Sequence, residues 1–235
     1  MEAAIPLAAG LIAAGTLGYA TFYQNSFIFG RVIWRGPKGK RHLYLTFDDG
    51  PHPSATSRIL DVLDALRTPA AFFMVGANVE KFPELARQVT ACGQTVGNHT
   101  FYHTKLHLKG PRFIFNELRR AHETITRVAG TQPRLFRPPH GYRNPFVSMA
   151  ARRMSYASFG WTFGVWDTDR PGAPEIRRRV VARLRPGAII LLHDGGDPGD
   201  HGQDRSQTAE ALPSIIADAG KLGYEFRSLM ELGGR

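Results

Sequence analysis

The chain of 235 residues is long enough for one domain with a full hydrophobic core. Its content of 43% apolar and 21% charged residues excludes a globally disordered chain. The formal net charge of +10 favours anionic partners, but the basic residues are spread along the chain without a nucleic-acid-binding motif, so we expect no nucleic acid partner.

The N-terminal residues form an uncharged, apolar stretch. No charged residue occurs between Ala3 and Gly30, and a bilayer-crossing helix needs roughly 20 apolar residues. Two residues precede this stretch and neither is basic, which is unlike the start of a signal peptide. We predict a membrane anchor or signal-like helix at 1–29 and a basic Gly/Pro linker at 30–40; the alternatives are a cleaved signal and a helix packed on the domain.

After the linker, short apolar runs alternate with amphipathic segments. Strands are expected at 42–47, 70–76, 94–98, 134–138, 155–161, 188–193 and 224–229. Helices are expected at 54–66, 79–92, 111–130, 144–154, 173–185 and 206–220. Because strand and helix alternate about seven times, we predict one α/β domain at 41–235, with parallel strands in a closed or nearly closed barrel.

Ionisable residues gather where five of these strands end, and catalytic groups of parallel barrels lie at the carboxyl ends of strands. The groups are Asp48-Asp49, His99 with His103, Arg137 with His140, Asp167 with Asp169, and His193. This placement predicts a catalytic site at one end of the barrel.

The pair His99 and His103 has a spacing at which two histidines share a metal ion, if the segment is helical. An aspartate from the first strand would complete two nitrogens and one oxygen and leave a position open for water. Of the adjacent Asp48 and Asp49, one carboxylate can bind the metal while the other accepts a proton from that water. The alternatives are two unrelated histidines on a loop and an Asx turn before Gly50-Pro51.

Three further residues fit the hydrolysis of an amide. His193 ends the most apolar strand and is expected to protonate the leaving amine. Asp167 or Asp169 would hold its tautomer and raise its pKa. Arg137 would pair with the base aspartate, and the alternative for it is a surface salt bridge of little energetic consequence.

Four motifs, TFDDGPHP, HTFYH, RPPHG and LLHDG, occur in this order, and the chain resembles the polysaccharide deacetylase family (NodB-homology, carbohydrate esterase family 4) from about residue 41 to residue 229. The resemblance implies a distorted (β/α)7-type barrel, here preceded by the N-terminal apolar helix. It also implies one divalent metal ion, usually Zn²⁺, although other first-row metals are possible. Asp49, His99 and His103 match the family's metal ligands.

The same resemblance implies roles for the other residues. Asp48 matches the general base, His193 the general acid, and Arg137 the arginine that orients the base. The backbone N–H of His140 is expected to stabilise the oxyanion. Substrate contacts are expected from Pro139, His140, Gly141, Leu191, Leu192 and Trp166, with Leu191 and Leu192 near the acetyl methyl group.

The chain departs from the family pattern at two places. His140 stands where the family commonly has Tyr, which is tolerable if only the backbone donates. The segment WDTDRPG lacks the Trp that usually follows the second aspartate, here Asp169, and walls the substrate groove. We choose Asp167 as the partner of His193, with Asp169 as second choice.

The sequence therefore predicts a hydrolase of carbon–nitrogen bonds other than peptide bonds that removes N-acetyl groups from amino sugars. The substrate would be a glycan or glycolipid: peptidoglycan, chito-oligosaccharide or a lipid-linked sugar. An O-acetyl esterase, a cyclic-amide hydrolase and an inactive membrane-tethered glycan-binding module are the alternatives.

We expect no obligate protein partner, and a membrane-associated protein that faces outward in the cell envelope. Basic residues between Arg31 and Arg41 favour the opposite, cytoplasmic side.

Overall fold

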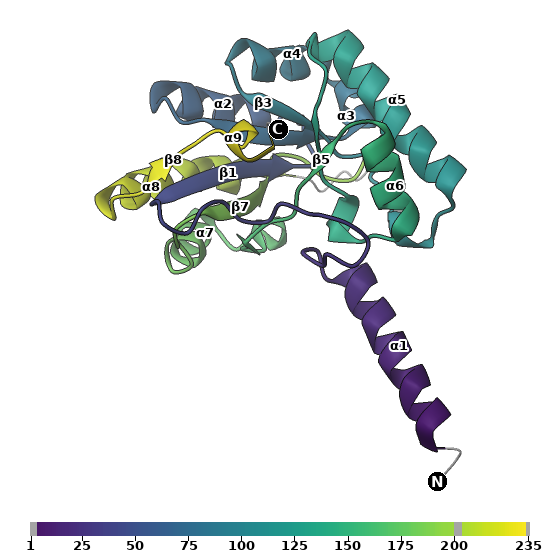
Figure 1. Ribbon diagram of the computed structural model, residues 1–235. Helices are drawn as coiled ribbons and strands as arrows, with labels where there is room; N and C mark the ends of the chain where they lie inside the picture. The colour runs from purple at the N-terminus through teal and green to yellow at the C-terminus, as the bar shows by residue number, and fades with distance from the viewer. Residues whose placement is uncertain (1–3, 200–203, 234–235) are drawn as a thin grey trace.

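The computed structural model describes residues 4–199 and 204–233. One curled sheet of parallel strands is covered by helices, and helix α1 (Ala4–Phe22) projects away from this domain (Figure 1). The strands are β1 (His42–Asp48), β2 (Ala70–Met74), β3 (Thr95–Asn98), β4 (Leu135–Phe136), β5 (Ala157–Ser158), β6 (Phe163–Gly164), β7 (Ala188–His193) and β8 (Glu225–Phe226). The predicted parallel barrel-type α/β fold is confirmed.

The helices of the domain follow the strands in the chain, and three of them begin at a proline, which has no N–H to leave unpaired there. They are α2 (Thr56–Ala65), α3 (Gly76–Lys81), α4 (Pro83–Ala91), α5 (Pro111–Ala129), α6 (Pro145–Arg153), α7 (Ala173–Val181), α8 (Ser206–Lys221) and α9 (Met230–Gly233). The 3₁₀ turns are η1 (Leu106–Leu108), η2 (Pro139–Gly141) and η3 (Asp167–Asp169). The single helix predicted at 79–92 is wrong, because Pro83 starts a new helix there.

The sheet order is β5-β4-β3-β2-β1-β7-β6, with β8 beside the start of β1. Within the described residues no pairing joins β5 to β6, so the sheet is a barrel left open at that place. The predicted strand at 155–161 is instead β5, and β6 is an additional short strand that pairs with β7. No helix separates β5 from β6, which is why the alternation of strand and helix did not reveal β6.

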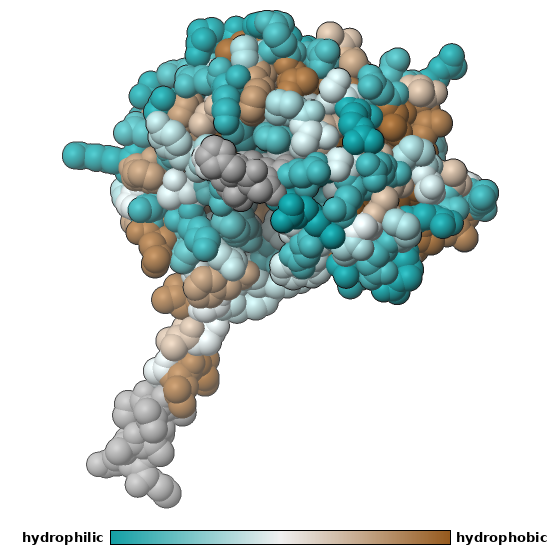
Figure 2. All heavy atoms as spheres, turned by 180° about the vertical axis from the view of Figure 1, so that it is seen from behind, coloured by the Kyte–Doolittle hydropathy of each residue, from teal (hydrophilic) through white to brown (hydrophobic). Residues whose placement is uncertain are grey.

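The chain after α1 packs on the domain. Ile33 and Arg35 form bridges with Phe159 and Ala188, so the predicted linker touches the sheet at two points. Figure 2 shows hydrophobic residues along the described part of α1. Among the described residues, no helix has the length and apolar character that crossing a bilayer requires, so the structure does not support the predicted anchor. Residues 1–3 of that segment lie outside the described residues.

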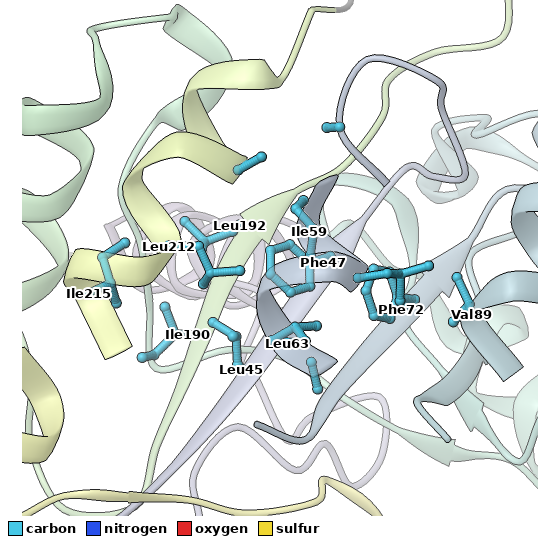
Figure 3. Packing of buried hydrophobic residues seen from close by; sticks show 14 of the residues in the cluster. Leu45, Phe47, Ile59, Leu63, Phe72, Val89, Ile190, Leu192, Leu212 and Ile215 are labelled. Atoms are coloured by element: carbon cyan, nitrogen blue, oxygen red, sulfur yellow. The ribbon is translucent and has the colours of Figure 1, made fainter. Parts of the chain in front are cut away.

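The two faces of β1 serve different purposes. Successive strand residues point to opposite sides. Leu45 and Phe47 pack in the main core between the sheet and its helices, with Ile59 of α2 among their partners (Figure 3). Thr46 and Asp48 lie on the other face, inside the barrel, where both are buried. Burial of each large apolar side chain contributes about 1.5–3 kcal/mol, so the outer face stabilises the fold while the inner face carries polar groups.

Candidate metal centre and active site

A cleft of about 440 Å³ opens at the carboxyl ends of the strands. Nine of the residues that line it are Asp48, Asp49, His99, His103, His140, Trp161, Trp166, Leu191 and His193. Because β1 and β7 pair with Asp48 opposite His193, these two side chains reach the same end of the sheet. The parallel register thus assembles in space the groups that the sequence distributes along the chain.

The two adjacent aspartates point to different partners. Asp48 continues the alternation of β1 into the barrel, whereas Asp49 has a φ of 75° and turns the chain at the strand end. The side chain of Asn78 fixes this turn by donating to the backbone oxygen of Asp49 at 2.7 Å. Gly50 is required next, because a Cβ there would lie 2.0 Å from Oδ2 of Asp194.

Asp49, His99 and His103 come together as one cluster. Asp49 Oδ1 lies 3.3 Å from Nε2 of His99 and 3.1 Å from Nε2 of His103, and one ligand atom from each residue falls within 4.8 Å of the others. All three side chains are buried. Asp49 Oδ1 has no hydrogen-bond partner among the described residues. A buried carboxylate oxygen that faces two imidazole nitrogens fits a divalent cation as the missing partner.

The spacing of His99 and His103 predicts a shared metal ion only if the segment between them is helical. In the structure this segment is not helical. Thr100 and His103 have positive φ angles of 67° and 59°, so the chain loops back on itself. Asn98 Oδ1 accepts from the N–H of Thr100, and Thr100 Oγ1 accepts from the N–H of His103. These hydrogen bonds bring the ring centres of His99 and His103 to 5.0 Å from each other without a helix.

The remaining ring nitrogen of each histidine is also held. His99 Nδ1 lies 2.6 Å from the backbone oxygen of Arg137, and His103 Nδ1 contacts the carboxylate of Asp197. Such partners orient metal-ligating imidazoles. Burial alone would lower the pKa of His103, but Asp49 and Asp197 raise it to about 10. Metal binding must therefore displace a proton from this ring.

Arg137 holds Asp48. The guanidinium is fully buried; its Nη1 donates to Asp48 Oδ1 at 2.6 Å and to Thr46 Oγ1 at 2.9 Å, and its Nη2 donates to the backbone oxygen of Gly160. The alternative of a surface salt bridge is wrong. Asp48 Oδ2 remains directed to the cleft, 3.7 Å from Nε2 of His99, and is the oxygen available to accept a proton.

His193 and Asp167 form a second pair, in which Asp167 is buried and His193 is half-buried at the cleft. Asp167 Oδ1 lies 2.9 Å from Nδ1 of His193, and Oδ2 accepts from the backbone N–H of His193 and from Thr208 Oγ1. Burial alone would lower the pKa of His193, but the charge of Asp167 and this hydrogen bond raise it to about 9. His193 is therefore protonated at neutral pH and can donate a proton from Nε2. Asp169, the second choice, is exposed at the end of η3.

The structure brings some of the predicted substrate contacts to the cleft. His140, Leu191 and Trp166 line it, and the side chain of Trp166 is 69% exposed. Leu192 lies in the main core, because it points to the opposite side of β7 from Leu191 and His193 (Figure 3). Pro139 and Gly141 are buried in η2 and shape the turn without lining the cleft.

The sequence reasoning missed several residues at the site, of which three have a clear role. Asp197 follows β7 in the segment GGDPG, where its closeness to His193 in the sequence was the only signal. Asn78 lies at the start of α3 with no motif to mark it. Trp161 lines the cleft and packs beside Arg137, with the guanidinium carbon 5.7 Å from the ring centre.

A family model described as polysaccharide deacetylase matches residues 35–159. A chitooligosaccharide deacetylase from Bradyrhizobium sp. (strain ANU 289) is 39% identical over 201 residues, which cover 83% of this chain and 91% of that protein. This chain belongs to the polysaccharide deacetylase family. The deacetylases of this family are hydrolases that act on carbon–nitrogen bonds, and the resemblance seen in the four motifs is confirmed.

Two solved structures of the polysaccharide deacetylase family show what the fold alone does and does not imply. The Bc1960 peptidoglycan N-acetylglucosamine deacetylase superposes with a TM-score of 0.79 at 30% identity, covering 85% of this chain and 91% of that one. BA3943 from Bacillus anthracis, a pseudoenzyme of carbohydrate esterase family 4, superposes with a TM-score of 0.78 at 27% identity, covering 86% of this chain and 68% of that one. Since both share the fold, activity must be argued from the residues of the site.

Proposed function

We propose that this polysaccharide deacetylase removes the acetyl group from an N-acetylated amino sugar of a glycan or glycolipid. The observation that carries the proposal is the geometry of the cleft. The metal cluster of Asp49, His99 and His103 lies beside Asp48, and His193 stands opposite Asp48 across the β1–β7 pair. This arrangement supports a metal site, a base and an acid at one end of the barrel.

Asp49, His99 and His103 would hold a divalent cation, and their two nitrogens and one oxygen suit Zn²⁺ or another first-row metal. When bound, the cation would act as a Lewis acid that lowers the pKa of water and polarises the acetyl carbonyl. The chain supplies the remaining steps. Asp48 Oδ2 accepts the proton of the attacking water, while Arg137 holds the Asp48 carboxylate in place through Oδ1.

His193 completes the reaction by protonating the leaving amine. Its raised pKa of about 9 keeps the proton available at neutral pH, and Asp167 directs Nε2 towards the cleft by holding Nδ1. The backbone N–H of His140 is proposed as an oxyanion donor at the cleft wall. Leu191 offers an apolar surface near the reacting groups that suits the acetyl methyl group.

The alternative is an inactive glycan-binding module, because the fold is shared with the pseudoenzyme BA3943. The present chain retains every group that hydrolysis needs: the three metal ligands, the base with its arginine, and the acid with its aspartate. This completeness supports catalysis over binding alone.

Acetate release from a panel of substrates tests the proposal. The panel contains N-acetylated chito-oligosaccharides, peptidoglycan and an O-acetylated xylan, so that N-deacetylation is separated from esterase activity. We expect release from N-acetylated substrates, and a loss of about 10²–10⁴-fold in rate for Asp48→Asn and for His193→Ala. Asp169→Asn, at an exposed aspartate of η3, is the matched control and should retain the wild-type rate. Near-normal rates in the first two variants would contradict the proposed roles.

We also propose that the domain works on the outer side of the cell membrane, because the glycans of the cell envelope lie there. Protease treatment of intact cells tests this location. Digestion of the domain in intact cells is expected, and protection until the cells are broken would contradict an outward orientation.

A further inference from the structure

The surface beside α1 combines exposed apolar residues with basic ones. Four exposed apolar side chains come from η1, α5 and α6: Leu108, Phe113, Phe146 and Met149. Four exposed bases come from the same elements: Lys105 just before η1, Lys109, Arg112 and Arg152. We call these eight residues the α1-proximal face.

The elements of this face are joined to one another and to the base of α1. The side chain of Asn144, just before α6, donates to the backbone oxygens of Leu106, His107 and Lys109. The ring of Phe22, at the end of α1, packs edge-on against His107 at 5.3 Å. Figure 2 shows hydrophobic residues on α1 and where α1 meets the domain.

The charge of this face is not balanced. The stretches 99–116 and 124–166, which include all eight residues of the α1-proximal face, contain no Asp or Glu, and neither does 3–47, which includes α1. None of the four bases of the α1-proximal face forms an ion pair with a described residue. Elsewhere on the surface, several exposed arginines pair with acids, as Arg58 does with Glu210.

We propose that the α1-proximal face binds the surface of an anionic phospholipid bilayer. Unpaired bases next to a membrane surface are attracted by anionic headgroups, and exposed apolar side chains gain free energy by entering the interfacial region. Leu108 is 82% exposed and Met149 is 53% exposed, so both can insert without rearranging the domain. An acidic glycan would satisfy the bases but leave these apolar side chains in water, and a second copy of the same face would be repelled.

The face also lies next to the cleft. Tyr142 lines the cleft, and its ring packs edge-on against Phe22 at 5.3 Å. Docking of the α1-proximal face would therefore hold the opening of the cleft close to the lipid surface. The inference does not depend on the proposed deacetylation, because lipid binding is measured without substrate.

Co-sedimentation of the full chain with vesicles tests the proposal. Vesicles made of equal parts of phosphatidylglycerol and phosphatidylcholine are compared with vesicles of phosphatidylcholine alone. The apolar variant carries Leu108→Ser, Phe146→Ser and Met149→Ser, and the charge variant carries Lys109→Glu and Arg112→Glu. We expect the wild type to sediment with the anionic vesicles, and each variant to lose binding by about tenfold or more.

The chain offers a matched control at the ends of α2 and α8. Leu66 and Leu222 are also exposed there, beside the exposed bases Arg67 and Lys221. Leu66→Ser with Leu222→Ser, and Arg67→Glu with Lys221→Glu, should bind anionic vesicles like the wild type. Circular dichroism checks that all variants are folded. Equal wild-type binding to both kinds of vesicle, unchanged binding in the two test variants, or an equal loss in the controls would overturn the proposal.

Discussion

Replacement of Asp167 by Asn tests how the proton donor is prepared. The charge of Asp167 is a main cause of the raised pKa of His193, which is about 9 against an ordinary value of 6.5. Asn has nearly the same shape but no charge, so the lowering of the pKa by burial is then opposed only by the smaller effects of the Asp49 and Asp48 charges. The pKa of His193 in the variant should therefore return to its ordinary value or fall below it.

The sign and size of the effect follow from the role of His193. An acid must carry its proton to act, so the rate falls as pH rises through the pKa of His193. With a pKa of about 9, about 90% of His193 is protonated at pH 8. With a pKa of about 6.5, only about 3% is protonated, and the rate at pH 8 falls roughly thirtyfold.

The assay is the pH profile of kcat for acetate release, measured for the wild type and for Asp167→Asn. The alkaline limb of the variant should lie about two pH units or more below that of the wild type. Asp169→Asn serves as the control, because this exposed aspartate belongs to the same 3₁₀ turn and should not move the limb. If the limbs of Asp167→Asn and the wild type coincide, Asp167 does not set the pKa of the proton donor.

Three other predictions concern the metal, the buried ion pair and the core. Asp197→Asn removes the carboxylate that orients His103 and should weaken Zn²⁺ binding by about 10–100-fold in competition with a chromophoric chelator; unchanged affinity would contradict this role. Arg137→Met leaves Asp48 buried without its partner and should lower the free energy of unfolding by about 3–5 kcal/mol in urea. Adding Asp48→Asn to Arg137→Met should restore part of the lost free energy of unfolding. No recovery in the double variant would contradict a stabilising Arg137–Asp48 ion pair. Leu192→Ala should cost about 2–5 kcal/mol in the same assay without changing KM, whereas a raised KM would place Leu192 at the substrate.

The sequence allowed the fold class to be predicted because parallel strands buried on both faces leave a strong apolar pattern. Runs such as 188–193 and 42–47 gave strands within one residue of β7 and β1. The short strand β6 left no such pattern, since two residues cannot show a period and no helix sets them apart from β5. The proline at 83 marked the start of α4, but the apolar spacing continued across it and concealed the break.

The site could be located from the sequence because ionisable residues follow the strands. The spacing of His99 and His103 suits a shared metal ion if the segment is helical, yet positive φ angles at Thr100 and His103 produce the same convergence through a loop. Asp197 could not be assigned, because only the folded chain shows which loop carboxylate reaches Nδ1 of His103. Adjacent residues of a strand point to opposite sides of the sheet, so Leu192 packs in the main core. The prediction that both Leu191 and Leu192 contact the substrate did not take this alternation into account.

The central claim is that Asp49, His99 and His103 bind one catalytic cation. The most direct measurement is the metal content of the purified full chain after Zn²⁺ loading and removal of free metal, for the wild type and for Asp49→Ala. Near-stoichiometric metal in the wild type, and its loss together with activity in Asp49→Ala, is the result predicted here. Full activity in wild-type protein that retains no metal would contradict the claim.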